Sequence, residues 1–411
     1  MKSLLIIGIT FPEPTTTAAG GRIMQIIQLF EEEGFEITFA STALPSERSV
    51  KFEEIGIRVE NIVLNSSSFD AFILKLKPDI VLFDRYNSEE QFGWRVADHC
   101  PNAVRILDTE DLHFLRKARQ KAVKENIPVA KAHLFTEAAK RELASILRSD
   151  ISLIISEAEM ELLRTIFVIP KDLLYYLPFL VEALSKEKIG TLPKYEERDH
   201  FITIGNFRHA PNTDSVMFLK KDIWPRIKDR LPEAELHIYG AYAPKHITDL
   251  HNEADGFMIR GWTRDVSEVM EKARVCLAPL RFGAGLKGKL LDAMLNGTPS
   301  ITTSIGSEGM QGEFPFAGMI EDEIDGIVNA TVLLYSEKEL WLAAQQNGFK
   351  IVENRFQKDS FSIAFTQKIK QLQRNLTSHR IQNFIGQILQ HQSLQATKYM
   401  GIWIEEKSRK T

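Results

Sequence analysis

The segment 281–294, RFGAGLKGKLLDAM, brings glycines, lysines and one carboxylate together at a spacing that suits phosphate binding. Gly283, Gly285 and Gly288 match the dinucleotide fingerprint G-x-G-x-x-G, and the same stretch through Lys289 matches the start of a P-loop. Both patterns predict a strand, a glycine turn and a helix whose N-terminal amides face a phosphate. The segment is therefore the first candidate for a site that binds a phosphate compound.

The neighbouring residues argue against both standard motifs. A P-loop needs Ser or Thr after its lysine to bind magnesium, but Leu290 follows Lys289 here. A dinucleotide fingerprint normally opens the first strand–helix unit and has an acid about 20 residues further on. This loop lies deep in the second half of the chain, and the acid at that distance, Glu308, lies in a GSEG loop. An NAD-dependent oxidoreductase therefore remains only as an alternative.

A third interpretation rests on the helix that follows the loop. A helix that begins near Gly288 places Lys289 and Asp292 on the same face, with the neighbouring leucines on a buried face. The N-terminal amides, together with Lys287 and Lys289, would attract a diphosphate. The Asp292 carboxylate could accept two hydrogen bonds from the diol of a ribose. This spacing predicts one end of a nucleotide site, whereas a tight turn before an ordinary amphipathic helix explains it without a ligand.

Two further groups stand where a strand is expected to end. Gly20 and Gly21 lie between the first apolar run and the first helical pattern, so their amides could face an anion. Arg208 follows the apolar run FITIG, and its guanidinium would suit a diphosphate at the carboxyl end of that strand. The alternatives are a glycine turn made for helix packing and a plain surface arginine.

Composition and charge place the chain among ordinary globular proteins. It has 411 residues, of which 44% are hydrophobic and 26% charged, and its formal net charge of −4 gives no reason to expect nucleic acid as a partner. Its two cysteines cannot form a disulfide framework and have no metal-ligand spacing around them. The apolar run at the N-terminus is too short for a secretion signal, and no run is long enough to span a membrane. We expect a cytoplasmic protein.

Short apolar runs alternate with helical patterns along most of the chain, and this alternation must position the candidate residues. The first half has runs such as LLIIGI, DIVLFD and AVRILD, and the second half restarts with FITIG, ELHIYG and RVCLAPL. The pattern predicts an α/β architecture of two halves, each with a mainly parallel sheet between helices. Ligands of such sheets bind at the carboxyl ends of the strands, so we expect a ligand cleft between the halves.

Shifts in composition divide the chain into four parts. We predict a Rossmann-like domain at residues 1–180 and a second one at 201–374. The polar stretch 181–200 shows no convincing strand or helix pattern and is expected to be the linker. Residues 375–411 are predicted to form a helical tail that packs on the first half or on a partner chain.

Three segments of the second half resemble the group 1 glycosyltransferases (glycosyltransferase family 4), whose fold is called GT-B. They are GNFRHAPNTDSV, IRGWTRDVSEVMEKARV and LAPLRFGAGLKGKLLDAMLNGTPSITTSIGSEGM, and they occur in the order of the family. The resemblance is strong from Phe201 to Met310 and concerns only topology before that. It implies two Rossmann-like domains that face a central cleft, with a nucleotide-sugar donor bound by the second and the acceptor by the first.

The resemblance also implies roles for single residues. Asp292 would hold the ribose, in a position where the family has glutamate. A second family glutamate, which contacts the donor sugar, corresponds to Ala284 in this chain. The paired-glycine loop would approach the donor phosphates across the cleft. The predicted diphosphate site comprises Gly20, Gly21, Arg208, Gly285, Lys287 and Lys289.

Many relatives carry a histidine–aspartate pair close to the reacting sugar, and in this chain the corresponding segment is LDTEDLHFLR. The alignment puts Glu110 where the histidine usually stands and Asp111 at the aspartate, while His113 could substitute if the loop is re-formed. We therefore treat Glu110, Asp111 and His113 as catalytic candidates. An N-cap role for Asp108 or Asp111 fits the same pattern.

The predicted activity is transfer of a sugar from a nucleoside-diphosphate sugar to a hydroxyl acceptor, with the retention of anomeric configuration that the resemblance implies. No Asp-x-Asp motif occurs, so we expect no metal and no cofactor, and lysines, an arginine and helix ends would stabilise the leaving diphosphate. The acceptor would be a glycan, a lipid-linked sugar or a small molecule. A basic stretch between Asp111 and Arg148 predicts either a solvated helix pair or a face for an anionic acceptor or a membrane surface. A sugar-nucleotide epimerase and a non-catalytic nucleotide-sugar binder remain alternatives, and the oligomeric state stays open.

Overall fold

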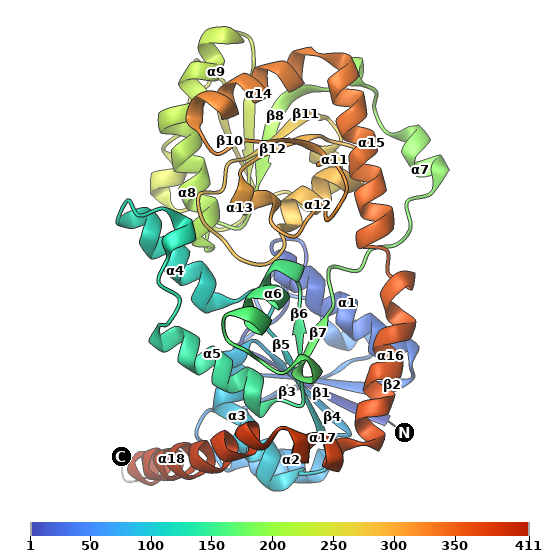
Figure 1. Ribbon diagram of the computed structural model, residues 1–411, viewed down its shortest axis with the longest axis vertical. Coiled ribbons are helices and arrows are strands. Elements are labelled where there is room, and N and C mark those ends of the chain that lie inside the picture. The colour runs from blue at the N-terminus through green and yellow to red at the C-terminus, as the bar shows by residue number, and fades with distance from the viewer. Residues whose placement is uncertain (1, 410–411) are drawn as a thin grey trace.

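The structure, a computed structural model, describes residues 2–409 apart from the side chains of residues 392–396. Residues 410 and 411 of the predicted tail lie outside the described range. Figure 1 shows two α/β domains stacked along the long axis of the molecule, with the last helices running back along the first domain. The α/β class with two parallel sheets is therefore confirmed.

The first domain contains a seven-stranded parallel sheet in the order β3-β2-β1-β4-β5-β6-β7. Its strands are β1 (Lys2–Gly8), β2 (Phe35–Ser41), β3 (Arg58–Asn61), β4 (Ile80–Asp84), β5 (Val104–Asp108), β6 (Ile151–Ile154) and β7 (Leu174–Tyr176). Its helices are α1 (Ala18–Glu32), α2 (Ser68–Leu76), α3 (Tyr86–His99), α4 (His113–Lys124), α5 (Glu137–Arg148) and α6 (Glu157–Thr165). The order of the strands reverses between β1 and β4.

Alternation of apolar side chains along the strands explains why both faces of this sheet are covered. Leu4 and Ile6 of β1 lie in a buried cluster with α1, whereas Leu5 and Ile7 of the same strand lie in a second cluster with α2, α3 and α5. A strand buried on both faces reads as a continuous apolar run, which is why LLIIGI predicted it.

The second domain repeats this plan with a six-stranded parallel sheet in the order β10-β9-β8-β11-β12-β13. Its strands are β8 (Asp199–Ile204), β9 (Leu236–Tyr239), β10 (Phe257–Gly261), β11 (Ala273–Ala278), β12 (Ser300–Thr302) and β13 (Gly318–Ile320). Its helices are α8 (Ala210–Phe218), α9 (Trp224–Arg230), α10 (Lys245–Thr248), α11 (Val266–Met270), α12 (Gly288–Leu295), α13 (Ser304–Ser307), α14 (Ile324–Ser336) and α15 (Lys338–Arg355). Its order reverses between β8 and β11.

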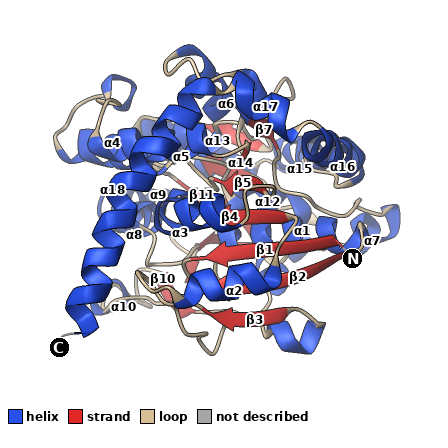
Figure 2. Ribbon diagram, turned by 90° about the horizontal axis from the view of Figure 1, so that it is seen from below, coloured by secondary structure: helices blue, strands red, loops and turns tan. Residues whose placement is uncertain are grey.

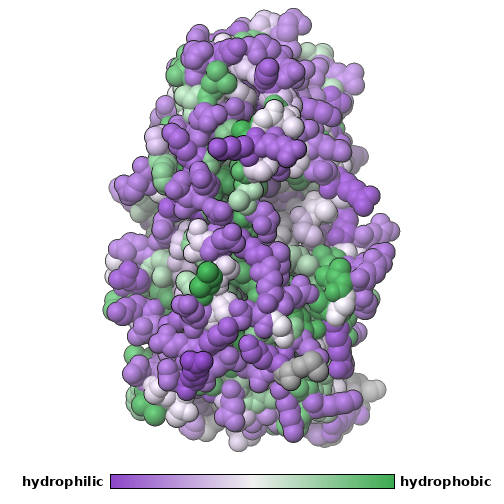
Figure 3. Space-filling view, turned by 90° about the vertical axis from the view of Figure 1, so that its right-hand side faces the viewer, coloured by the Kyte–Doolittle hydropathy of each residue, from purple (hydrophilic) through white to green (hydrophobic). Residues whose placement is uncertain are grey.

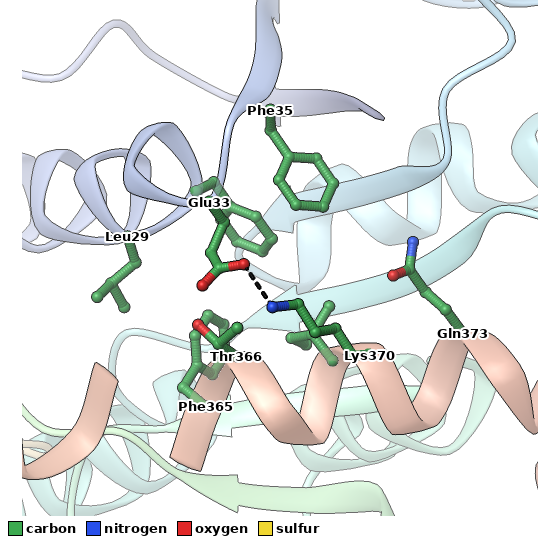
Figure 4. Close-up of a pocket in the computed structure, with 9 residues that line it drawn as sticks. Leu29, Glu33, Phe35, Phe365, Thr366, Lys370 and Gln373 are labelled. Carbon is green, nitrogen blue, oxygen red and sulfur yellow. Dashed lines mark ion pairs between the residues drawn. The ribbon is translucent and has the colours of Figure 1, made fainter. Parts of the chain in front are cut away.

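The last three helices return to the first domain. They are α16 (Asp359–Arg374), α17 (Leu376–Gln382) and α18 (Phe384–Arg409). Phe365, Ile369 and Leu372 of α16 complete the buried cluster on the α1 side of the first sheet. Figure 4 shows the edge of this contact, where Lys370 of α16 makes an ion pair of 2.7 Å with Glu33 at the end of α1.

Beyond α16, the tail lies on the opposite side of the first domain. Arg380 of α17 donates to both carboxylate oxygens of Asp150 at 2.7 Å, and α18 packs along α3 and α5 (Figure 2). The prediction that the tail packs on the first half is confirmed for the described residues.

The linker and the molecular surface complete the fold. The linker role of residues 181–200 stays a prediction, but the expectation that they carry no helix or strand was wrong. They contain the short helix α7 (Lys186–Thr191), which Ser185 caps at its N-terminus, and the start of β8. Figure 3 shows that the face carrying α15 and α16 is mainly hydrophilic, with scattered apolar side chains. None of the helices between residues 2 and 409 combines the length and hydropathy needed to cross a bilayer.

Candidate active site

The loop after β11 and the start of α12 form the centre of the candidate site. The helix begins at Gly288, as its sequence predicted, and buries Leu290, Leu291 and Met294. Gly285 adopts a φ of +61°, a conformation that side chains with a Cβ rarely adopt. The glycine pattern is therefore used for a tight turn at the carboxyl edge of the second sheet, next to the point where its strand order reverses.

Asp292 and Lys289 lie one turn apart on this helix, and both are perturbed by burial. Burial raises the pKa of Asp292 to about 7 although Lys289 opposes the shift. Burial lowers the pKa of Lys289 to about 8, and its Nζ donates to Asn212 Oδ1 at 2.9 Å. The Asp292 carboxylate accepts no hydrogen bond from any residue within the described range. A vicinal diol would supply the donors that this carboxylate can accept.

Lys287, the second predicted lysine, turns back toward the loop. Its Nζ donates to the carbonyl oxygen of Gly285 at 2.5 Å. Burial lowers the pKa of Lys287 to about 8, and Glu308 and Glu159 oppose that shift. Its side chain is thus a buried cation between the loop and two carboxylates of opposite domains. Ala284, which the resemblance puts at a glutamate position of the family, packs with buried residues of the first domain.

The two glycines of the first domain do not lie where the sequence placed them. They are inside α1, whose N-cap is Thr17, and not between the strand and the helix. The Gly20 amide donates to Thr17 Oγ1 at 2.9 Å and the Gly21 amide to Thr17 O at 3.2 Å. A Cβ atom at Gly20 would lie 2.6 Å from the backbone of Glu13, so packing requires this glycine. Phosphate binding by either amide stays a prediction and would require Thr17 to release it.

Arg208 lies after β8, at the same sheet edge as the loop 283–289. Its guanidinium carbon is 3.5 Å from the ring centroid of Tyr242, and Tyr242 Oη donates to the carboxylate of Glu13 at 2.8 Å. Glu13 belongs to the loop after β1. Arg208 therefore lies where the carboxyl ends of β1 and β8 meet, which fits its prediction, and its ligand stays a prediction.

The acceptor-side candidates follow β5 and begin α4. Burial opposes ionisation of Asp111, but Arg116, His113 and His209 outweigh it and lower its pKa to about 2. His113 Nε2 lies 3.4 Å from Asp111 Oδ1. Burial lowers the pKa of His113 to about 3, so the ring is neutral at pH 7. The structure thus brings a carboxylate and a neutral imidazole together.

Glu110 points to a different partner. Its carboxylate accepts from Arg85 Nη2 at 2.9 Å, and both residues have a positive φ, +59° for Glu110 and +69° for Arg85. Such backbone conformations cost on the order of 1–3 kcal/mol each and cluster at functional sites. Burial raises the pKa of Glu110 to about 8, although Arg85 opposes the shift. Arg85 was not among the predicted site residues, and its position directly after the run DIVLFD was the available signal.

The loop 283–289 after β11 and the loop 109–112 after β5 are in direct contact. A Cβ atom at Gly285 would lie 2.8 Å from the Cβ of Asp111, and one at Gly288 would lie 2.6 Å from the Cβ of Ala18. The contact between the domains, called the seam below, therefore brings together the loop 283–289 and the Asp111–His113 pair. Glu159 and Arg119, which also bind the loop, were missed because their positions in the sequence carry no motif.

Comparison with known proteins relates this geometry to a family. Residues 198–337 match the family model described as "Glycosyl transferases group 1". No curated protein sequence matches the chain.

Solved structures relate the whole chain to a fold. The sucrose-phosphate synthase of Thermosynechococcus elongatus superposes with a TM-score of 0.67 at 14% identity, over 90% of this chain and 99% of that one. A glycosyltransferase of Rickettsia africae gives 0.66 at 12% identity, over 91% and 99%. Anabaena HepE, solved in complex with UDP and glucose, gives 0.62 at 12% identity, over 89% and 99%. Residues 198–337 thus form a group 1 glycosyltransferase domain, in a chain that has the GT-B fold and is an enzyme of the glycosyltransferase class.

Proposed function

We propose that this enzyme moves a sugar from a nucleoside-diphosphate sugar to a hydroxyl acceptor, with retention and without a metal. The observation that carries the proposal is the contact between two unlike surfaces. On one side, Lys289 and Asp292 share a face at the start of α12. On the other, the Asp111–His113 pair touches the same loop at Gly285. A donor held by α12 would therefore present its sugar to that pair.

In this proposal the second domain binds the nucleotide. The Asp292 carboxylate accepts hydrogen bonds from the two ribose hydroxyls, and Lys289, Lys287 and Arg208 face the diphosphate together with the first amides of α12. The bond between the anomeric carbon and the phosphate oxygen breaks, so negative charge grows on the leaving diphosphate. Fixed cations at that place would stabilise the transition state more than the ground state.

The first domain binds the acceptor. A bond forms between the acceptor oxygen and the anomeric carbon, and the hydroxyl proton must leave. The neutral His113 ring is the candidate that takes this proton, and its pKa of about 3 must rise in the complex, where the ionised Asp111 and the diphosphate charge would stabilise the resulting cation. Glu110 stays a third catalytic candidate, but as a proton donor, because burial raises its pKa to about 8 and keeps it protonated near neutral pH.

The class of donor is suggested by a related structure, and the class of acceptor by the charges next to the Asp111–His113 pair. UDP is the first nucleotide to test, because the structure of Anabaena HepE contains UDP and glucose. Helix α4 carries no acid between His113 and Lys124, and Lys117, Lys121 and Lys124 are exposed on it. This basic surface next to the Asp111–His113 pair favours an anionic acceptor, such as a polysaccharide intermediate or a lipid-linked sugar at a membrane surface.

The testing experiment is a thermal-shift panel with UDP, GDP, ADP, TDP, CMP and NAD, repeated on Asp292→Ala and Lys289→Ala. A ligand at about 100 times its Kd stabilises the folded state by roughly 2.7 kcal/mol. We expect a shift with one nucleoside diphosphate that both variants lose. A shift with NAD alone, or with none of the six, would contradict the proposal. The nucleotide sugar of the best base then serves as donor in an assay for transfer, and NMR of the product reports the anomeric configuration.

A further inference from the structure

Glu159 of α6 is a buried carboxylate that joins the two domains. It is 0% exposed, and its Oε1 accepts from the Leu112 amide at 2.9 Å and from the Gly285 amide at 2.8 Å. Leu112 belongs to the loop 109–112 of the first domain, the acceptor-side loop of the proposed function, whereas Gly285 belongs to the loop 283–289 of the second domain, its donor loop. One oxygen therefore fixes the distance between the donor loop and the acceptor-side loop.

The same loop is held from its other side by Arg119. Arg119 Nη1 donates to the Gly283 carbonyl at 2.9 Å, and the guanidinium makes a bidentate pair with Glu308 at 2.7 and 2.8 Å. The first domain thus binds the Gly283–Gly285 turn at a carbonyl and at an amide. Because Gly285 has no room for a Cβ against Asp111, the turn is set directly on the acceptor-side residues.

We infer that Glu159 is a positioning residue of the transfer reaction, which aligns the donor loop with Asp111 by bonding both loops at once. The inference rests on the proposed function for its catalytic consequence, but not for the contact itself. Its bond to Gly285 exists only while the domains are together, so closing the domains and aligning the loops become one event. A misplacement of about 1 Å at such a site costs on the order of 100-fold in rate.

The state of the carboxylate supports a role beyond packing. Its second oxygen, Oε2, is buried and has no hydrogen-bond partner among the described residues. Burial and the neighbouring Asp111 raise the pKa of Glu159 to about 7, while Leu112, Lys287 and Gly285 oppose the shift. A half-satisfied buried carboxylate destabilises the fold, and such groups are retained where function requires them.

Glu142 provides a matched control. It is 1% exposed, and it likewise accepts two backbone amides, from His113 at 3.1 Å and Phe114 at 2.8 Å. Burial raises its pKa to about 8. All of its partners belong to the first domain, so it matches Glu159 in chemistry and differs in not crossing the seam.

Amide hydrogen exchange tests the contact in the full-length protein without any substrate. We expect the peptide that contains Gly285 to exchange about tenfold faster in Glu159→Ala and at the wild-type rate in Glu142→Ala. The peptide at the start of α4 should respond in both variants. Glu159→Gln keeps an acceptor oxygen for the two amides, so its exchange should stay within about twofold of wild type.

Transfer kinetics test the consequence. We expect kcat to fall about tenfold or more in Glu159→Ala, with the donor KM changed less than about threefold, and to recover in Glu159→Gln. Unchanged exchange at Gly285 in Glu159→Ala would overturn the interdomain contact. Faster exchange with unchanged kcat would overturn the positioning role. Faster exchange in a protein whose wild type transfers no sugar would uphold the contact and reject the proposed function.

Discussion

Asp292 is a residue whose ionisation opposes folding. Because its pKa in the folded protein is about 7, well above the usual range for aspartate, the native state keeps a proton that the unfolded chain has lost. The native state thus binds more protons between about pH 4 and pH 7, and stability falls as the pH rises through that window. The carboxylate is half-buried and has no side-chain hydrogen bond among the described residues, which fits a site that accepts hydrogen bonds from a diol.

The substitution Asp292→Asn removes this pH-dependent loss. We expect its Tm to exceed that of the wild type by roughly 2–4 °C at pH 8 and to equal it at pH 4, as a shift of a few pKa units predicts. Differential scanning calorimetry of the ligand-free proteins at both pH values measures the effect. An equal difference at both values would show that the carboxylate is not the cause. The variant should also lose the nucleotide-induced shift.

Lys289 predicts a second pH dependence, that of the donor KM, because it loses a positive charge as the pH rises. Burial lowers its pKa to about 8, so above pH 8 the free enzyme loses a cation of the proposed diphosphate site. We expect the donor KM to rise between pH 8 and pH 9.5 in the wild type. Lys289→Arg keeps its charge over that range, and its KM should rise less. Steady-state kinetics at five or six pH values decide this, and parallel profiles for the two proteins would exclude Lys289 as the group that titrates.

At the scale of elements, the two glycines of α1 differ in what surrounds them. A Cβ atom at Gly20 would meet the Glu13 backbone at 2.6 Å, whereas one at Gly21 meets nothing within 4 Å. We expect Gly20→Ala to destabilise the fold by about 1–3 kcal/mol. Gly21→Ala should stabilise it by about 0.4–1 kcal/mol, because alanine restricts the unfolded chain.

Chemical denaturation of both glycine variants measures these effects. Nucleotide titration of Gly21→Ala adds a test of phosphate binding. Alanine keeps the amide but adds a Cβ atom, which would hinder a phosphate that approaches this amide closely. Unaltered affinity together with higher stability would assign Gly21 to the helix alone, whereas weaker binding would return it to the donor site.

Elements with a long pattern were predictable from the sequence, and several short ones were not. β4 and β5 appeared as apolar runs that end in Asp84 and Asp108, and α12 as a helix beginning at Gly288. β7 and β13 have three residues each, too few for any periodicity, and α7 starts in a polar stretch without an apolar face.

Within the site, the pairs of residues that could be predicted are those that share one element. Lys289 and Asp292 could be paired because they lie one turn apart on a helix. Glu159 and Gly285 are 126 residues apart, and Arg119 and Gly283 are 164 apart. Each of these contacts depends on how two domains meet, which no local pattern encodes. Thr17 was missed as the cap of α1 because the two glycines were interpreted as a turn, so the helix was predicted to begin after them.

At the scale of the whole molecule, the chain crosses between the domains twice at almost the same place. The Val181 amide donates to Phe356 O at 2.8 Å and the Lys358 amide donates to Val181 O at 2.9 Å, so residues 181 and 357 are bridged. The first domain is thus made of two pieces of chain that enclose the second. Our sequence division, which assigned residues up to 374 to the second domain, stays a prediction that fragments of the chain can test.

The packing of α16 argues for a different division. Phe365 is 2% exposed and lies in the core of the first domain, whereas Ile363 on the same helix is 68% exposed. Phe365→Ala should therefore cost about 3–5 kcal/mol, and Ile363→Ala should stay within about 0.5 kcal/mol of the wild type. Fragment 1–181 lacks α16, so we expect it to expose that core and to aggregate. Joining residue 181 to residue 357 through about five Gly and Ser residues, and ending at 383, restores the helix without the second domain.

We expect the joined fragment to be monomeric and to unfold in one cooperative transition, with near-UV circular dichroism that shows fixed aromatic packing. Ile155 and Phe179 face the second domain and become exposed in the joined fragment. A variant with serine at both positions is therefore used to keep the fragment soluble. The same fragment with Phe365→Ala is the control, because its chain length is unchanged. Cooperative unfolding of fragment 1–181 alone would show that α16 is not part of the first domain. If the joined fragment does not fold and fragment 1–181 does, the result would support the division at residue 374.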